Sequence, residues 1–258
     1  MSTRTRLSYN INLNPTTNFT IHIADPSSIT ADNLALATWG SAEVLANTLH
    51  KLPDIHLSPR TSPSEQATNT NDDAPLISVL ELGAGTGIAG LAAACIWRTP
   101  VILTDLPLLV PNLQANIELN NDLLAKHSGL AHSGTLDWSE PSILHLTGSS
   151  QTTTTAAGQQ TQRARVLLAA DTVYSDEHPP LLTQTIVARL ELSALARVVL
   201  CYPLRIGYLD HIRALWEALE EAGLSSRAEG RERVDESWEE DVEYEWVVWG
   251  WSSEKLRA

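Results

Sequence analysis

The sequence predicts an α/β fold in which a mostly parallel sheet carries helices on both faces. Along the chain, apolar strand-like segments alternate with segments of helical character, which is the rhythm of βαβ units. The first strand of this series ends in a glycine-rich loop, V-L-E-L-G-A-G-T-G at residues 79–87, and a helix is expected directly after it. Because 258 residues suffice for one large α/β domain, a single domain spanning residues 1–258 is expected.

Four strand–helix units form the centre of the predicted domain. Their strands are expected at residues 77–82, 101–105, 165–171 and 196–202, and their helices near residues 89, 110–119, 180 and 208–222. A short strand near residues 133–136 adds to the same sheet. Before the first unit, an amphipathic helix is expected at residues 42–49, within an N-terminal extension of residues 1–50.

The C-terminal end differs from the parallel units. Residues 244–251 are aromatic and β-branched, and the charged stretch before them leaves no room for another crossover helix. This strand is therefore expected to pair antiparallel with a strand near residues 226–234, as a closing hairpin. We interpret its tryptophans as packing residues of the sheet.

Two segments, residues 58–75 and 148–162, interrupt the alternation. Both are rich in small polar residues and contain few large apolar ones. Such a composition cannot build a packed core, so both segments are expected to be flexible inserts in surface loops.

Composition and charge limit the partners and the location. The net charge of −14 argues against direct binding of nucleic acid, although the acidic stretch at residues 217–245 could attract a basic protein substrate. The longest apolar run, residues 88–97, is too short to span a bilayer, and no signal core opens the sequence. Cys95 and Cys201 lie in apolar runs without redox spacing, and the eight histidines show no metal-binding spacing. A soluble, reduced, cytoplasmic protein with no metal and no membrane contact is expected.

The glycine loop and an acidic residue after it predict a nucleotide-type cofactor pocket. Glycine lets the backbone approach a ligand closely, and the N-terminal amides of the following helix point into the same space. Asp105 ends the next strand, 22 residues after Gly83 and 20 after Gly85, where an acidic residue can accept hydrogen bonds from a ribose diol.

The loop alone leaves more than one interpretation open. Residues 85–90 also spell G-x-G-x-x-G, the dinucleotide fingerprint, and the glycines could simply make a tight turn. No tyrosine has a lysine four positions later, which argues against a short-chain dehydrogenase. No G-x-S-x-G elbow is present, which argues against an α/β-hydrolase.

Four motifs together resemble the seven-β-strand methyltransferases that use S-adenosylmethionine, and within them family 16, which contains many protein-lysine methyltransferases. These are T-W-G-S at 38–41, V-L-E-L-G-A-G-T-G at 79–87, L-D-W at 136–138 and A-A-D-T-V-Y at 169–174. The glycine loop is shared by many methyltransferases, whereas the D-x-x-Y motif combined with the N-terminal Trp is more restrictive. The resemblance implies a Rossmann-like, seven-stranded sheet and S-adenosylmethionine as the cofactor.

The resemblance also implies roles for individual residues. The loop would cradle the methionine part of the cofactor, Asp105 would hold its ribose, and Trp138 would lie at the adenine. The full set of implied cofactor-binding residues is Trp39, Glu81, Gly83, Gly85, Gly87, Asp105, Leu106, Trp138 and Ala170.

Asp171 and Tyr174 of the D-x-x-Y motif are the candidate catalytic residues. Methyl transfer from a sulfonium is a direct displacement, so the protein must align the nucleophile and exclude water. We expect Asp171 to orient the entering amine and Tyr174 to form part of the channel wall. Tyr202 ends the fifth strand at the same edge and is a further candidate for the substrate entrance, although it could equally belong to a strand-ending turn.

The expected substrate is a lysine of a cytosolic protein. T-W-G-S, T-D-L-P at 104–107 and D-T-V-Y-S at 171–175 are similar to a fungal branch that acts on translation elongation factors. Two alternatives stay open, namely methylation of a small molecule on the same fold and a non-catalytic module that only binds the cofactor. No repeat or heptad suggests assembly, so a monomer is expected.

Overall fold

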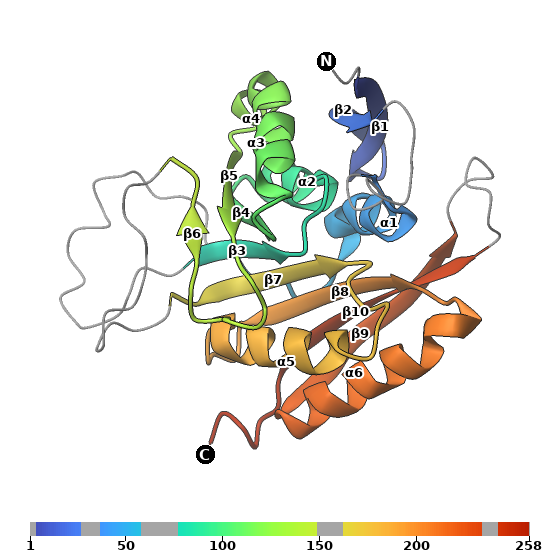
Figure 1. The fold of residues 1–258 in the computed structure, drawn as a ribbon. Coiled ribbons are helices and arrows are strands. Elements are labelled where there is room, and N and C mark those ends of the chain that lie inside the picture. The colour runs from blue at the N-terminus through green and yellow to red at the C-terminus, as the bar shows by residue number, and fades with distance from the viewer. Residues whose placement is uncertain (1–3, 27–36, 58–76, 149–161, 234–241, 258) are drawn as a thin grey trace.

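The computed structural model describes residues 4–26, 37–57, 77–148, 162–233 and 242–257, and it is organised around one eight-stranded sheet (Figure 1). The strand order is β6-β5-β4-β3-β7-β8-β10-β9. These strands are β3 (Ile77–Leu82), β4 (Pro100–Asp105), β5 (Leu130–Thr135), β6 (His145–Leu146), β7 (Ala164–Ala170), β8 (Arg197–Pro203), β9 (Leu224–Arg233) and β10 (Glu243–Trp251).

Five central strands, β5, β4, β3, β7 and β8, run parallel, and β10 pairs antiparallel with both β8 and β9. The predicted mostly parallel sheet and its closing hairpin are therefore confirmed. β3 lies in the middle of the sheet and contributes apolar side chains to both faces. Val79 packs on one side, whereas Leu80 and Leu82 pack on the other, because successive side chains of a strand point to opposite faces.

Helices cover both faces of the sheet. They are α1 (Gly40–Thr48), α2 (Ile88–Trp97), α3 (Val110–Leu119), α4 (Asn121–Lys126), α5 (His178–Arg189) and α6 (Leu209–Glu221), with short 3-10 turns η2 (Leu49–Lys51) and η3 (Ile206–Tyr208). α5 and α6 lie together below the sheet in Figure 1, and α1 and α2 contact one another on the other face.

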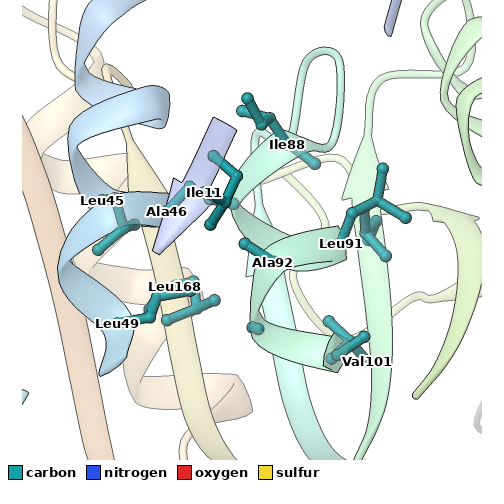
Figure 2. Packing of buried hydrophobic residues seen from close by; sticks show 14 of the residues in the cluster. Ile11, Leu45, Ala46, Leu49, Ile88, Leu91, Ala92, Val101 and Leu168 are labelled. Atoms are coloured by element: carbon teal, nitrogen blue, oxygen red, sulfur yellow. The ribbon is translucent and has the colours of Figure 1, made fainter. Parts of the chain in front are cut away.

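The core accordingly has two parts, one on each face. Figure 2 shows the first, to which β1, α1 and α2 contribute Ile11, Leu45 and Leu91. The second packs α5 and α6 against the sheet through residues such as Ile186 and Leu215. Both faces of the sheet are thereby shielded, as a parallel sheet requires.

Two features correct the sequence prediction. The sheet has eight strands and not seven, because β6, only two residues long, pairs antiparallel with β5. Two residues cannot display a periodic pattern, so no signal in the sequence marks β6. The N-terminal extension also contains a separate hairpin, β1 (Arg4–Asn14) and β2 (Thr17–Pro26), which was not predicted.

This hairpin is part of the core. Ile11, Phe19, Ile21 and Ile23 are buried in the same cluster as α1 and α2. Their alternation with polar residues is the usual pattern of a half-buried strand. At the turn, the Asn14 side chain accepts hydrogen bonds from the backbone N–H groups of Thr16 and Thr17.

The first predicted insert, residues 58–75, and residues 149–161 of the second lie outside the described residues. Among the described helices, none is long and apolar enough to cross a membrane.

Candidate functional site

A pocket of about 360 Å³ opens at the carboxyl ends of the parallel strands. From β3, the chain builds one half of the sheet outward through β4 and β5. It then returns to β7 on the other side of β3 and builds the second half outward through β8. The direction in which strands are added therefore reverses between β3 and β7. In open α/β sheets this crevice is where ligands bind. The lining residues are Trp39, Gly83, Gly85, Asp105, Leu106, Leu109, Leu136, Asp137, Trp138, Ala170, Asp171, Thr172, Tyr174, His178 and Leu181.

Nine of the predicted site residues meet in this pocket although they come from distant parts of the chain. They are Trp39, Gly83, Gly85, Asp105, Leu106, Trp138, Ala170, Asp171 and Tyr174. The loops after β3, β4, β5 and β7 each contribute to the lining, since the carboxyl ends of parallel strands share one edge.

The glycine loop leaves space for a ligand to approach the backbone at Gly85. The φ of Gly85, +55°, lies in the left-handed region, which favours glycine, and a Cβ built there would meet no protein atom within 4 Å. The loop therefore presents bare backbone to open pocket space. A bulky group can approach Gly85 there without displacing a side chain.

Asp105 is the buried acceptor next to this loop. Its two carboxylate oxygens accept hydrogen bonds from the backbone N–H groups of Gly85 and Leu106, both at 2.7 Å. Burial raises the pKa of Asp105, while these two hydrogen bonds oppose the shift. A carboxylate oxygen can accept more than one hydrogen bond, so the pair of oxygens can also receive two hydroxyl groups of a ligand.

Aromatic rings form another wall of the pocket. The rings of Tyr174 and His178 meet edge to face with centroids 4.2 Å apart, and Trp138 meets His178 at 6.0 Å. The backbone N–H of Tyr174 donates to Nδ1 of His178 at 3.3 Å, which places the imidazole proton on Nε2. Burial lowers the pKa of His178, so the ring is neutral near pH 7.

Asp171 follows β7 in a strained conformation. Its φ of +56° is unusual for a residue other than glycine, and its backbone N–H donates to the carbonyl of Cys201 at 2.9 Å. The carboxylate is half-buried at the pocket wall. Strained backbone of this kind concentrates at functional sites, where the surrounding structure holds it in place.

Tyr174 contributes a phenol at the same wall. Burial raises its pKa, and the nearby charges of Asp105 and Asp171 act in the same direction. The phenol is therefore uncharged at neutral pH. Its side chain is nevertheless 58% exposed, which leaves it accessible at the pocket mouth.

Three predicted site residues do not line the pocket. Glu81 is buried beneath the glycine loop, where its carboxyl group accepts a hydrogen bond from the backbone N–H of Gly90 at 3.0 Å. Gly87 is the N-cap of α2, and a Cβ there would lie 2.6 Å from Leu113. Tyr202 is 2% exposed, and its hydroxyl is bonded to Trp216 and Glu245, so it lies away from the pocket.

Several lining residues were missed by sequence reasoning. Leu109 and Leu181 are apolar residues whose type carries no functional signal. His178 begins α5 four residues after Tyr174, and its proximity to the D-T-V-Y motif was the one available clue.

Comparisons with known proteins show which family the sequence matches. Residues 27–208 match a family model described as lysine methyltransferase. The protein-lysine N-methyltransferase EFM2 of Saccharomyces cerevisiae is 31% identical over 82% of this chain and 47% of its own length. The protein-lysine N-methyltransferase rrg1 of Schizosaccharomyces pombe is 35% identical over 44% of this chain and 32% of its own length. The chain thus spans about half the length, or less, of these curated relatives.

A solved structure shares the fold at low sequence identity. A candidate RNA methyltransferase of Pyrococcus horikoshii superposes with a TM-score of 0.53 at 12% identity, covering 90% of this chain and 92% of that chain. At this identity the likeness concerns the fold alone. It agrees with the parallel sheet described above.

Proposed function

The chain belongs to the lysine methyltransferase family, whose cofactor is S-adenosylmethionine, and from this premise we propose that it methylates a lysine amine of another protein. The observation that carries the proposal is the meeting of Asp105, Gly85, Asp171 and Tyr174 in one pocket. The relatives' names support a protein as the substrate.

The residues of the pocket fit this cofactor. The open space at Gly85 accepts a bulky group close to the backbone, and the Asp105 oxygens suit a ribose diol. Trp138 offers a flat apolar surface for an adenine. When bound, S-adenosylmethionine supplies a methyl group on a positively charged sulfur.

Asp171 and Tyr174 are assigned to the lysine side of the pocket. A lysine amine with its usual pKa of about 10.4 is protonated at neutral pH and must lose a proton before it can attack. Desolvation in the channel favours this loss, and the proton passes to water at the exposed mouth of the pocket. Asp171 then accepts a hydrogen bond from the amine and orients its lone pair, while the rings of Tyr174 and His178 restrict water.

The exposed rim of the pocket supports a protein substrate over a small metabolite. Leu106 is 50% and Tyr174 is 58% exposed, although both line the pocket. A site that encloses a metabolite would cover such side chains, whereas a site for a lysine on a large partner must leave its mouth accessible.

We extend the proposal to a translation elongation factor as the substrate, on the strength of the T-W-G-S, T-D-L-P and D-T-V-Y-S motifs. A cytoplasmic location and a monomeric state belong to the same proposal. The two buried free cysteines, Cys95 and Cys201, are compatible with a reducing compartment.

The test is transfer of labelled methyl groups from S-adenosylmethionine to proteins of a yeast extract, resolved by size. Asp171→Asn is the informative variant, because asparagine tolerates the positive φ and replaces the carboxylate by a neutral amide of similar size. Asp122→Asn, which alters an exposed carboxylate of α4, is the matched control.

A discrete labelled protein with wild type and the Asp122 variant, lost with Asp171→Asn, is expected. The mass of that band tests the elongation factor. Label found only in small molecules would contradict protein methylation, and cofactor binding without any transfer would indicate a non-catalytic module.

A further inference from the structure

Two buried asparagines of α3 and its C-terminus hold the N-terminal hairpin. Asn116 Oδ1 accepts a hydrogen bond from the backbone N–H of Ala24 at 3.0 Å, and Asn120 Oδ1 accepts one from His22 at 2.9 Å. Asn120 also donates to the carbonyl of His22 at 2.7 Å. Because the two residues are four positions apart, their side chains lie on the same face of the helix. They pair with β2 through side-chain amides in the manner of a neighbouring strand.

The amide nitrogen of the Asn116 side chain contacts the glycine loop. Its Nδ2 donates to the carbonyl of Thr86 at 3.0 Å, and Asn116 is fully buried. Thr86 lies between Gly85 and Gly87, both of which have positive φ. Asn120 instead donates to the carbonyls of His22 and Asn116. Both asparagines therefore bind the hairpin. Only the amide donor of Asn116 is directed to the glycine loop.

A further hydrogen bond connects the glycine loop to the segment that contains Trp39. The hydroxyl groups of Thr86 and Thr38 are 3.0 Å apart, and both side chains are buried. Thr38 directly precedes Trp39, which lines the pocket. A continuous buried path thus runs from β2 through Asn116 and Thr86 to the segment that carries Trp39.

A loop rich in glycine needs such an external support. Its residues lose more conformational freedom on ordering than other residues, and a glycine has no side chain of its own to pack. Asn116 fixes one peptide carbonyl in the middle of the loop. Loss of the donor would leave that buried carbonyl without this partner, which costs more than an exposed hydrogen bond does.

We propose that Asn116 is a positioning residue that holds the glycine loop in its cofactor-binding conformation and couples the loop to the N-terminal hairpin. The inference rests on the proposed function in so far as S-adenosylmethionine is the ligand of the pocket. It goes beyond that function because it assigns a role in cofactor binding to a residue outside the pocket lining and to the hairpin.

The experiment compares Asn116→Asp with Asn120→Asp. Each substitution keeps an oxygen for the β2 backbone N–H and replaces the amide donor by a second oxygen. Binding of S-adenosylmethionine and of its demethylated product is measured by calorimetry on the full chain. We expect at least about a tenfold loss of affinity in Asn116→Asp and less than about a twofold change in Asn120→Asp.

A second readout needs no ligand. The backbone N–H of Gly87 donates to the carbonyl of Ala84 at 2.8 Å within the loop. Its hydrogen exchange should be faster in Asn116→Asp than in wild type and unchanged in Asn120→Asp. If the aspartate variants do not fold, Asn116→Ser and Asn120→Ser make the same comparison with a smaller polar group.

The outcomes separate the two proposals. Wild type that binds neither ligand would overturn the cofactor assignment, while the exchange measurement would still test the role of Asn116. Binding by wild type together with equal affinities in all variants, or an equal loss in both asparagine variants, would overturn the positioning role of Asn116.

Discussion

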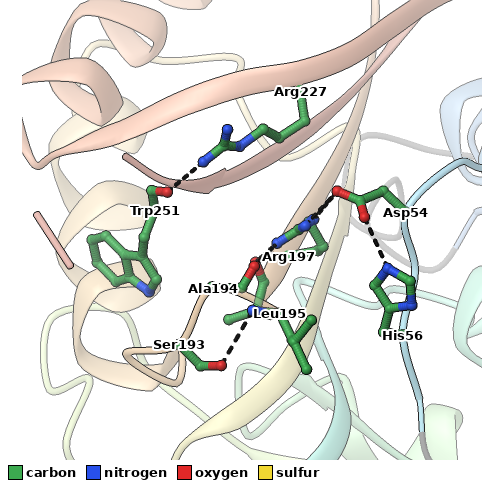
Figure 3. Close-up of polar contacts among 9 residues, drawn as sticks. Asp54, His56, Ser193, Ala194, Leu195, Arg197, Arg227 and Trp251 are labelled. Carbon is green, nitrogen blue, oxygen red and sulfur yellow. Dashed lines mark hydrogen bonds and ion pairs between the residues drawn. The ribbon is translucent and has the colours of Figure 1, made fainter. Parts of the chain in front are cut away.

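The two edges of the sheet use their charged groups in opposite ways. At the carboxyl edge, the buried carboxyl groups of Asp105 and Glu81 accept hydrogen bonds from backbone N–H groups, and burial raises the pKa of both. At the amino edge, Arg197 at the start of β8 forms an ion pair with Asp54 and donates to the carbonyls of Ala194 and Ala196 (Figure 3). The Arg197 guanidinium lowers the pKa of Asp54.

The difference indicates that the charged groups at the amino edge stabilise the fold, whereas those at the carboxyl edge are arranged for a ligand. The pair at the amino edge matches opposite charges and tethers the segment after α1 to the sheet. At the carboxyl edge, buried carboxyl groups and the positive φ of Asp171 both oppose folding. Such features persist at ligand sites, because the remainder of the structure compensates for their cost.

Of the substitutions that test this difference between the two edges, we expect one at the carboxyl edge to have the largest effect on cofactor binding. In Asp105→Asn, one carboxylate oxygen becomes an NH₂ group that faces a backbone N–H, and the acceptor for a ribose hydroxyl is weakened. We expect S-adenosylmethionine affinity to fall by about 30- to 100-fold, or about 2–3 kcal/mol, in calorimetry. Asp54→Asn at the opposite edge should leave the affinity unchanged. Equal losses in the two variants would contradict the division.

The contribution of Glu81 to stability should depend on pH, which gives a second test of the comparison. Burial raises its pKa to about 8 from an ordinary value near 4.5, so the protonated form is favoured in the folded chain. Its contribution to stability is complete below about pH 4.5 and is lost as pH rises through about 8, at up to about 1.4 kcal/mol per pH unit.

Glu81→Gln should therefore remove this loss while keeping an oxygen for the Gly90 N–H. The stability of the variant relative to that of wild type should therefore rise by up to about 4 kcal/mol between pH 5 and pH 8, as measured by urea unfolding. A stability difference that does not change with pH would show that Glu81 is ionised in the folded protein.

Asp54 should show the opposite pH dependence. Because its pKa is lowered in the folded chain, its contribution is present above about pH 4 and disappears as pH falls below that value. Asp54→Asn should cost about 1–2 kcal/mol at pH 7, less than a fully buried pair, since the Asp54 side chain is 42% exposed. Urea unfolding at pH 7 and pH 3 tests this, with Asp122→Asn as the exposed control. A loss at pH 3 as large as the loss at pH 7 would contradict the assignment to the ion pair.

The smallest expected effect on stability comes from Gly85→Ala. The new Cβ would meet no protein atom, so only the positive φ should destabilise the fold, by about 1 kcal/mol. Gly148 is a matched control, because it also has positive φ and open space at the Cβ position. Both variants should lose similar stability in thermal unfolding, but only Gly85→Ala should lose cofactor affinity. A similar affinity in both would place the cofactor away from Gly85.

Much of the site could be predicted because its signals are local. The glycine loop and Asp105 are joined by one βα unit, so their spacing along the chain reflects their proximity in space. The strands and helices of the parallel core were predicted for the same reason, since each has its own periodic pattern. β6 was missed because two residues carry no period.

Position along a strand did not determine which face a side chain occupies. Tyr202 lies one residue before the end of β8, at the predicted edge of the sheet. Its side chain nevertheless belongs to the cluster under α5 and α6, whereas Cys201 belongs to the cluster on the opposite face. A shift of one residue reverses the face, and the sequence near a strand end does not fix that choice.

The sequence by itself determined the succession of parallel strand–helix units, the position of the glycine loop and of Asp105 after it, and the family resemblance that the comparisons confirmed. Only the tertiary structure decided that the N-terminal hairpin packs on α3 and that Asn116 joins it to Thr86. Those contacts connect residues 92 and 30 positions apart. Buried amides meet their partners at such separations only after the sheet and its helices have packed, and no local pattern encodes the pairing.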